Sequence, residues 1–135
     1  MRLRLLWVDA PELTQPYGKQ AAYLAAGLLR GRLLEVSRTG ADGYGRTLAE
    51  LRVAIPVTRG ARRWLSVDSL LVARGGAWTY EPGRTVPALA VLQQQAQRNR
   101  QGLWRCGTAT AVRPAVWRAY NKQEKARAWV GCPGF

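Results

Sequence analysis

Residues 4–12 read Arg-Leu-Leu-Trp-Val-Asp-Ala-Pro-Glu, an apolar run that stops at two acidic residues with a proline between them. Apolar side chains on both sides of the run predict a strand over residues 1–8 that is covered on both faces. Pro11 cannot donate a hydrogen bond to a strand ladder, so the strand is expected to end at Asp9.

Asp9 and Glu12 follow this strand end, where their side chains can converge on one point. A hard divalent cation needs several oxygen ligands, and Asp9 with a backbone carbonyl would supply part of that shell. Glu12 would then orient or deprotonate an attacking water. Arg4 faces the other side of the strand by simple alternation, although the twist of a strand end can bring it to the same cleft. Taken alone, the two acids also fit a solvated turn, and Arg4 fits an exposed edge position.

The rest of the chain predicts short strands interleaved with helices, an α+β pattern. Three segments with apolar residues at helical spacing are expected to be helices: 16–30, a short segment that starts at Ser66 or Asp68, and 87–101. Strands are expected over 33–38 and, as one strand or a pair, over 44–57. A turn at 40–43 and a loop at 78–83 separate these elements.

Residues 42–46 read Asp-Gly-Tyr-Gly-Arg, and the two glycines permit a tight turn with a close backbone approach. A guanidinium held there by Arg46 could bind a phosphate with two parallel hydrogen bonds. The other interpretation is a hairpin turn with a surface arginine.

Trp78 and Tyr80 lie in a Gly- and Pro-rich stretch near Arg74 and Arg84. An aromatic ring on such a loop can stack on a nucleobase, which contributes about 1 to 3 kcal/mol per base. A ring that only caps the core is equally consistent with the sequence.

The charge is strongly unbalanced: 21 Lys plus Arg against 8 Asp plus Glu give a formal net charge of +13. Polyanions are therefore the expected partners, nucleic acid first and an anionic membrane surface second. The chain contains no histidine, which excludes Ser-His and Cys-His triads and His-ligated zinc. Hydrolytic chemistry would have to use carboxylates, arginines, tyrosines and an oxygen-ligated metal.

Cys106 and Cys132 are too far apart in sequence for a CxxC motif. A disulfide between them would stabilise the fold by about 3 kcal/mol in an oxidising compartment, and two unpaired core thiols are the alternative. No stretch of the sequence is long and apolar enough to span a membrane.

Several blocks, in one order, resemble the staphylococcal (micrococcal) nuclease, or thermonuclease, family. They are 4–12 (RLLxxDxPE in the family), 17–21 (YGxxA), 42–49 (DxYGRxLA), 67–71, 75–78 and 102–104. We therefore interpret residues 1–104 as a thermonuclease-like domain and residues 105–135 as a basic, Trp-containing extension.

The resemblance implies an OB-fold β-barrel of five strands with three helices, a Ca²⁺ site, and cleavage of DNA and RNA. It implies that Asp9 and the backbone carbonyl of Ala10 bind the calcium, and that Glu12 is the general base or positions the water. Arg4 and Arg46 would bind the scissile phosphate. The substrate contacts implied are Asp42, Tyr44 and either Trp78 or Tyr80.

The sequence also departs from the family pattern. In relatives, two strands and a DGDT-like segment with a second calcium-binding Asp precede the strand of residues 1–8, so we expect this barrel to lack its first two strands. Gly43 stands where the family has a lysine. An export signal in an upstream segment would send the protein to the periplasm or out of the cell, and without one it would be cytoplasmic.

Two functions remain compatible with the sequence. The first is a monomeric metal-dependent nuclease, and the alternative is a non-catalytic OB-like module that binds nucleic acid by charge and stacking. The extension mixes basic and aromatic residues, which suits either nucleic-acid contact or a helix packed on the barrel.

Overall fold

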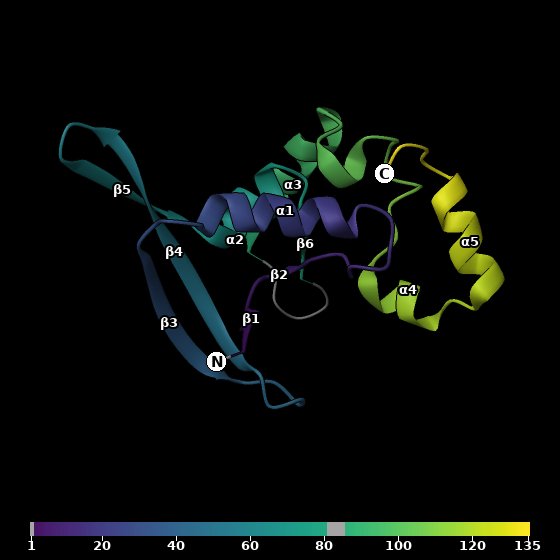
Figure 1. Ribbon diagram of the computed structural model, residues 1–135, viewed down its shortest axis with the longest axis horizontal. Coiled ribbons are helices and arrows are strands. Elements are labelled where there is room, and N and C mark those ends of the chain that lie inside the picture. Colours follow the sequence, from purple (N-terminus) through teal and green to yellow (C-terminus); the bar gives the residue numbers. More distant parts are fainter. Residues whose placement is uncertain (1, 81–85) are drawn as a thin grey trace.

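The computed structural model describes residues 2–80 and 86–135, and its architecture is α+β, as the sequence predicts (Figure 1). The strands are β1 (Leu3–Leu5), β2 (Val8–Asp9), β3 (Leu34–Ala41), β4 (Thr47–Thr58), β5 (Ala61–Ser66) and β6 (Trp78–Thr79). The helices are α1 (Gly18–Leu29), α2 (Val67–Ala73), α3 (Pro87–Arg98), the 3-10 turn η1 (Gly102–Trp104), α4 (Pro114–Ala119) and α5 (Lys122–Val130).

β4 is the central strand of the larger sheet. β3 and β5 pair with it in antiparallel fashion, and β1 pairs in parallel with its first residues, Leu3 opposite Thr47 and Leu5 opposite Ala49. Of the two alternatives for residues 44–57, the structure therefore has a single strand. In Figure 1 the β4–β5 hairpin projects away from the helical part of the molecule.

The strand expected over residues 1–8 is instead two short strands, because the chain bends at Leu6 and Trp7. The Leu6 N–H donates to the carbonyl of Ala49 at 3.1 Å, and the Trp7 N–H donates to the Asp68 carboxylate at 3.2 Å. After the bend, β2 leaves the larger sheet and pairs antiparallel with β6 in a second, two-stranded sheet. The bend matters because it carries the acidic strand end out of the large sheet.

The described residues do not close into the OB barrel that the resemblance implied. Among them β3 pairs only with β4, and all of its residues are exposed. β5, which pairs with the outer half of β4, was not predicted from the sequence. The arginines at positions 59, 62 and 63 interrupt the apolar alternation that usually marks a strand.

The main core lies between the larger sheet and helices α1, α2 and α3. Alternate residues of β4 are buried on this side, including Ala49, Leu51 and Val53. They contact apolar residues of the helices, of which Leu28, Leu71, Val72 and Leu89 are buried. α2 begins after Ser66, whose hydroxyl accepts a hydrogen bond from the Ser69 N–H at 3.2 Å, so the cap is Ser66 and not Asp68.

The sequence predicted three helices, and α1, α2 and α3 correspond to them. The described residues form five α-helices because the extension also folds, into α4 and α5 (Figure 1). Pro114 opens α4, and α5 opens with a capping box between Asn121 and Glu124. In the described part of the chain, no helix has the length and apolar character needed to cross a bilayer.

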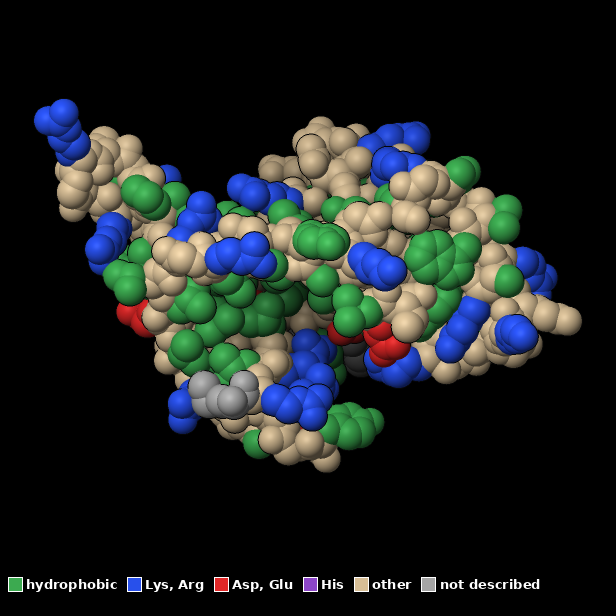
Figure 2. Space-filling model, in the orientation of Figure 1, with side chains coloured by type: hydrophobic (Ala, Val, Ile, Leu, Met, Phe, Trp, Pro, Cys, Tyr) green, Lys and Arg blue, Asp and Glu red, His purple; other side chains and the backbone are tan. Residues whose placement is uncertain are grey.

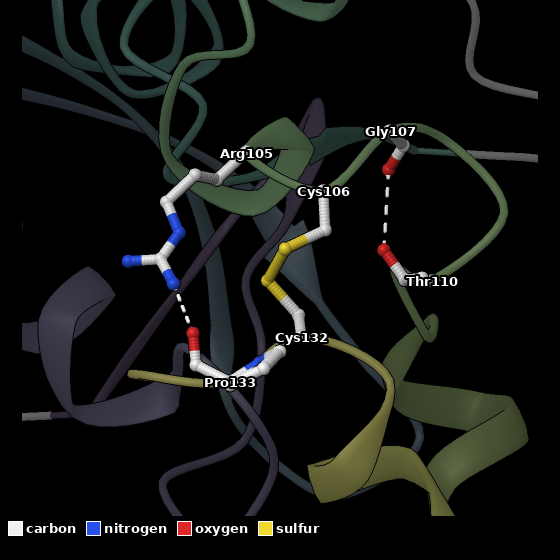
Figure 3. Close-up of a disulfide and its surroundings, with 6 residues drawn as sticks. All are labelled: Arg105, Cys106, Gly107, Thr110, Cys132 and Pro133. Atoms are coloured by element: carbon white, nitrogen blue, oxygen red, sulfur yellow. Dashed lines mark hydrogen bonds between the residues drawn. A yellow bond between two sulfur atoms is a disulfide. The ribbon is translucent and has the colours of Figure 1, made fainter.

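Cys106 and Cys132 form a disulfide, which settles the alternative left open by the sequence (Figure 3). Beside it, the Arg105 guanidinium donates to the carbonyl of Pro133. The bond ties the chain after α5 to the segment that follows η1. Because η1 belongs to a second core cluster with Trp78 and Ala96, the extension is attached to a packed part of the domain.

Candidate active site

Asp9 is the last residue of β2, where it lies opposite Trp78 of β6. Arg4 lies in β1, and the bend that follows β1 brings Asp9 next to the Arg4 side chain. Arg4 Nη1 donates to the carbonyl of Val8 at 2.8 Å, and Arg4 Nη2 lies 3.4 Å from Asp9 Oδ1. Arg4 and Asp9 thus form a partly buried ion pair at the strand end.

The charges around Asp9 only partly offset the cost of burying its carboxylate. Desolvation raises the pKa of its carboxyl above the ordinary value, and the positive charges of Arg4, Arg118 and Arg113 offset this only in part. The negative charge of Glu12 raises it further. A cation beside Asp9 would relieve this cost.

Glu12 lies in the loop between β2 and α1, and Gln15 holds that loop in shape. The Glu12 N–H donates to Gln15 Oε1 at 2.9 Å, and the Gln15 N–H donates to the Glu12 carbonyl at 3.1 Å. Gln15 is buried, with an exposed fraction of 1%, and its Nε2 donates to the carbonyl of Val112 at 2.6 Å. Gln15 was not predicted as a site residue, because its partner Val112 is 97 positions away in the sequence.

The Glu12 carboxylate has one partner that the sequence analysis did not foresee. Arg118 Nη1, from α4, donates to Glu12 Oε1 at 2.6 Å. This hydrogen bond is the main cause that raises the pKa of Arg118. Arg118 stood out in the sequence only as one of several basic residues of the extension.

Arg46 lies at the turn between β3 and β4, and Asp42 organises that turn. Asp42 Oδ1 accepts hydrogen bonds from the backbone N–H groups of Tyr44 and Arg46, each at 2.9 Å, and Oδ2 accepts from Arg46 Nε at 2.7 Å. Desolvation opposes ionisation of Asp42, but these hydrogen bonds outweigh it and lower its pKa. The turn therefore presents the Arg46 guanidinium in a fixed orientation, 5.8 Å from the centre of the exposed Tyr44 ring.

The two aromatic candidates lie in different environments. Trp78 is buried and packs edge-on against Trp104, with ring centroids 5.9 Å apart. Tyr80 is half-buried, and its ring lies 5.4 Å from the Arg4 guanidinium. Of the two, Tyr80 is the ring that lies over the Arg4 guanidinium, whereas Trp78 is the cross-strand neighbour of Asp9.

The structure therefore brings Arg4, Asp9, Glu12 and Tyr80 to one end of the small sheet. Arg46, Asp42 and Tyr44 form a second group at the β3–β4 turn. Among the described residues no ion pair joins this group to Asp9 or Glu12, but Tyr44, like Asp9 and Glu12, helps to raise the pKa of Arg118. Figure 2 shows blue Lys and Arg side chains bordering a recess in the middle of the face, beside a small red patch of acidic side chains.

The acidic end of β2 fits a calcium ion in the chemistry of its donors. Asp9 offers a carboxylate that lacks full compensation, and the exposed Ala10 offers a backbone carbonyl. No group of three His, Cys, Asp or Glu side chains suited to a metal occurs within residues 2–80 and 86–135. Water would therefore have to fill most of the six to eight positions that calcium prefers.

Over residues 2–106 the sequence matches the family described as staphylococcal nuclease homologue. The chain belongs to this family. It is 35% identical over 118 residues to an uncharacterized endonuclease of Escherichia coli O157:H7, which covers 87% of this chain and 71% of that protein. It is similar to Protein ParB of Escherichia coli, at 35% identity over 127 residues that cover 93% and 71% of the two chains.

It is also 31% identical over 124 residues to the micrococcal nuclease of Shigella flexneri, with 90% of this chain and 70% of that protein covered. The staphylococcal nuclease family match confirms the resemblance that the sequence blocks indicated.

Proposed function

We propose that this chain is a calcium-dependent nuclease that hydrolyses phosphodiester bonds in DNA and RNA. One observation carries the proposal: the bend after β1 places the guanidinium of Arg4 3.4 Å from the carboxylate of Asp9, three residues before Glu12. The nuclease names of the family members support the reaction class.

In the proposed reaction, Asp9 and the backbone carbonyl of Ala10 would hold a calcium ion. Calcium bound there would neutralise charge on the scissile phosphate and orient a water molecule. Glu12 accepts a proton from the attacking water through its carboxylate. Arg4 would donate hydrogen bonds to oxygens of the scissile phosphate.

Arg46 has a separate role in this proposal, at the turn where Asp42 fixes it. A phosphate gains negative charge in its pentacoordinate transition state, and a pre-oriented guanidinium stabilises that charge without reorganising. The Asp42 pairing supports this role because it leaves the Arg46 side chain held at the surface, with 35% of it exposed. Tyr44 and Tyr80 offer rings for stacking on the substrate, whereas Trp78 is buried against Trp104.

The proposal is tested with single-stranded DNA and RNA in calcium and in EDTA. We expect cleavage in calcium and none in the chelator. Glu12→Gln and Arg46→Ala should each lower kcat by at least about 100-fold, because each removes an interaction of the transition state.

Matched controls are Glu35→Gln and Arg52→Ala, an exposed ion pair on β3 and β4 that takes no part in the site. Both should retain wild-type rates. Salt-sensitive binding without cleavage by the folded wild-type protein would instead assign it as a non-catalytic nucleic-acid-binding module. Cleavage in another divalent cation but not in calcium would overturn the choice of metal alone.

A further inference from the structure

The extension turns back onto the loop that carries Glu12. Three hydrogen bonds join the two segments: Gln15 Nε2 to the Val112 carbonyl at 2.6 Å, Trp117 Nε1 to Thr14 Oγ1 at 3.2 Å, and Arg118 Nη1 to Glu12 Oε1 at 2.6 Å. Three residues of the loop, Glu12, Thr14 and Gln15, are therefore held by the extension. The two partners in each hydrogen bond are at least 97 positions apart in the sequence.

The helix that carries Arg118 is fixed independently of this contact. Trp117 is buried, with 3% of its surface exposed, and Lys125 of α5 lies 5.2 Å from its ring centre. The disulfide between Cys106 and Cys132 closes the whole segment into a loop. The backbone of Arg118 is thus attached to a packed helix and not to a free tail.

The Arg118–Glu12 pair contributes little to folding. Their side chains are 60% and 34% exposed, and ion pairs this open to water stabilise a protein only weakly. What the pair does is fix the orientation of a carboxylate. Arg118 occupies Oε1, and no described residue donates a hydrogen bond to Oε2, which leaves that oxygen for a water molecule.

We propose that Arg118 is a positioning residue for Glu12, so that the extension completes the active site of the nuclease. The inference rests on the proposed function, in which Glu12 accepts the proton of the attacking water. Arg118 holds Glu12 through one oxygen and aims the other at the water. The chemistry of the reaction is otherwise unchanged, and Arg118 itself does not touch the phosphate.

The test is the steady-state kinetics of Arg118→Ala and Arg118→Lys on an oligonucleotide in saturating calcium. We expect Arg118→Ala to lower kcat by about 10-fold with KM unchanged within about twofold, because misorientation of a general base slows the chemical step and leaves substrate binding intact. Arg118→Lys should recover part of the loss, since an ammonium keeps the charge but not the planar fork of a guanidinium.

A double mutant separates positioning from other roles. If Arg118 acts through Glu12, then Arg118→Ala should cause no further loss in a Glu12→Gln background. The control is Arg127→Ala, which removes an exposed arginine from α5 of the same extension and should leave both constants unchanged. Equal thermal unfolding midpoints of all variants would exclude a difference in folding.

Three results would overturn the inference. A raised KM with normal kcat would make Arg118 a substrate ligand, a raised kcat would make it a shield over Glu12, and wild-type constants would give it no role. These differ from failure of the proposed function, in which the wild-type protein itself would not cleave.

Discussion

Asp68 is the most deeply buried acidic residue described, with 2% of its surface exposed. Its Oδ2 accepts the N–H of Trp7 at the bend after β1, while Oδ1 has no hydrogen-bond partner among the described residues. Desolvation raises its pKa to about 6; the Trp7 hydrogen bond opposes this, and the charge of Glu50 adds to it. Asp68 therefore supports the bend at a cost that depends on pH.

Asp68→Asn should change how stability varies with pH. The folded state binds the Asp68 proton more tightly than the unfolded chain, where the pKa is near 3.8, so the free energy of unfolding falls as pH rises from about 4 to 6. The loss approaches about 3 kcal/mol. Asparagine cannot ionise, and its side-chain oxygen still accepts the hydrogen bond from the Trp7 N–H. The free energy of unfolding of the variant, relative to that of the wild type, should therefore rise by about 3 kcal/mol between pH 4 and pH 7.

Urea denaturation of both proteins at several pH values measures this gain. Acidic groups that do not interact with Asp68 contribute equally in the two proteins, so their contributions cancel in the difference. Parallel stability curves across the window would contradict the role assigned to Asp68.

The site residues that could be predicted from the sequence are those that lie or interact within a few positions of one another. Asp9 and Glu12 lie three positions apart, and Asp42 makes its bonds to residues two and four positions away. Gln15 and Arg118 were missed because their partners lie 97 and 106 positions away. Nothing in local spacing signals such contacts, which arise only when the extension folds back.

At the scale of elements, the start of α1 controls the shape of the Glu12 loop. Gly18 is the first residue of α1, and a Cβ there would collide with the backbone carbonyl of Glu12. Tyr17, just before it, is in the left-handed region with φ 69°. This tight entry leaves no room for a side chain.

Gly18→Ala should displace the loop and lower kcat by about 10-fold or more, because the carboxylate of Glu12 moves with its backbone. The matched control is Gly27→Ala in the same helix, where a Cβ meets nothing within 4 Å. That change should leave activity unaltered and stabilise the protein by about 0.5 to 1 kcal/mol, since alanine favours a helix interior. Kinetics and thermal unfolding of both variants check the pair, and equal activities would show that the loop adapts.

The predicted elements were most accurate where a strong local signal marks them. Pro87 opens α3 and Ser66 caps α2, as proline and serine do at helix starts. The single strand predicted over residues 1–8 was wrong because its bend is produced by distant partners, Ala49 and Asp68. The extension could be described from its sequence only by its basic and aromatic composition. The bounds of α4 and α5 are known from the structure.

At the scale of the whole molecule, the net charge of +13 governs encounters with polyanions. Each phosphate that the protein neutralises releases condensed counterions, and this gives a slope of about −0.7 per phosphate in log K against log salt for a single strand. Binding of single-stranded DNA, measured in EDTA to prevent cleavage, should therefore weaken steeply between about 50 and 200 mM salt.

Arg46→Ala should reduce that slope by about 0.7, because one phosphate contact is lost. Arg62→Ala, on the projecting β4–β5 hairpin, is the matched control and should leave the slope unchanged (Figure 1). Identical slopes for Arg46→Ala and the wild type would remove Arg46 from the phosphate contacts.

The cross-link between Cys106 and Cys132 has a consequence for the integrity of the molecule. A protease that cuts the backbone once anywhere between the two cysteines leaves both fragments covalently joined. Arg118, which lies inside this covalent ring, would stay tethered to the rest of the protein until a reductant opened it. Release of a fragment from this end of the chain therefore requires both cleavage of the backbone and reduction of the disulfide.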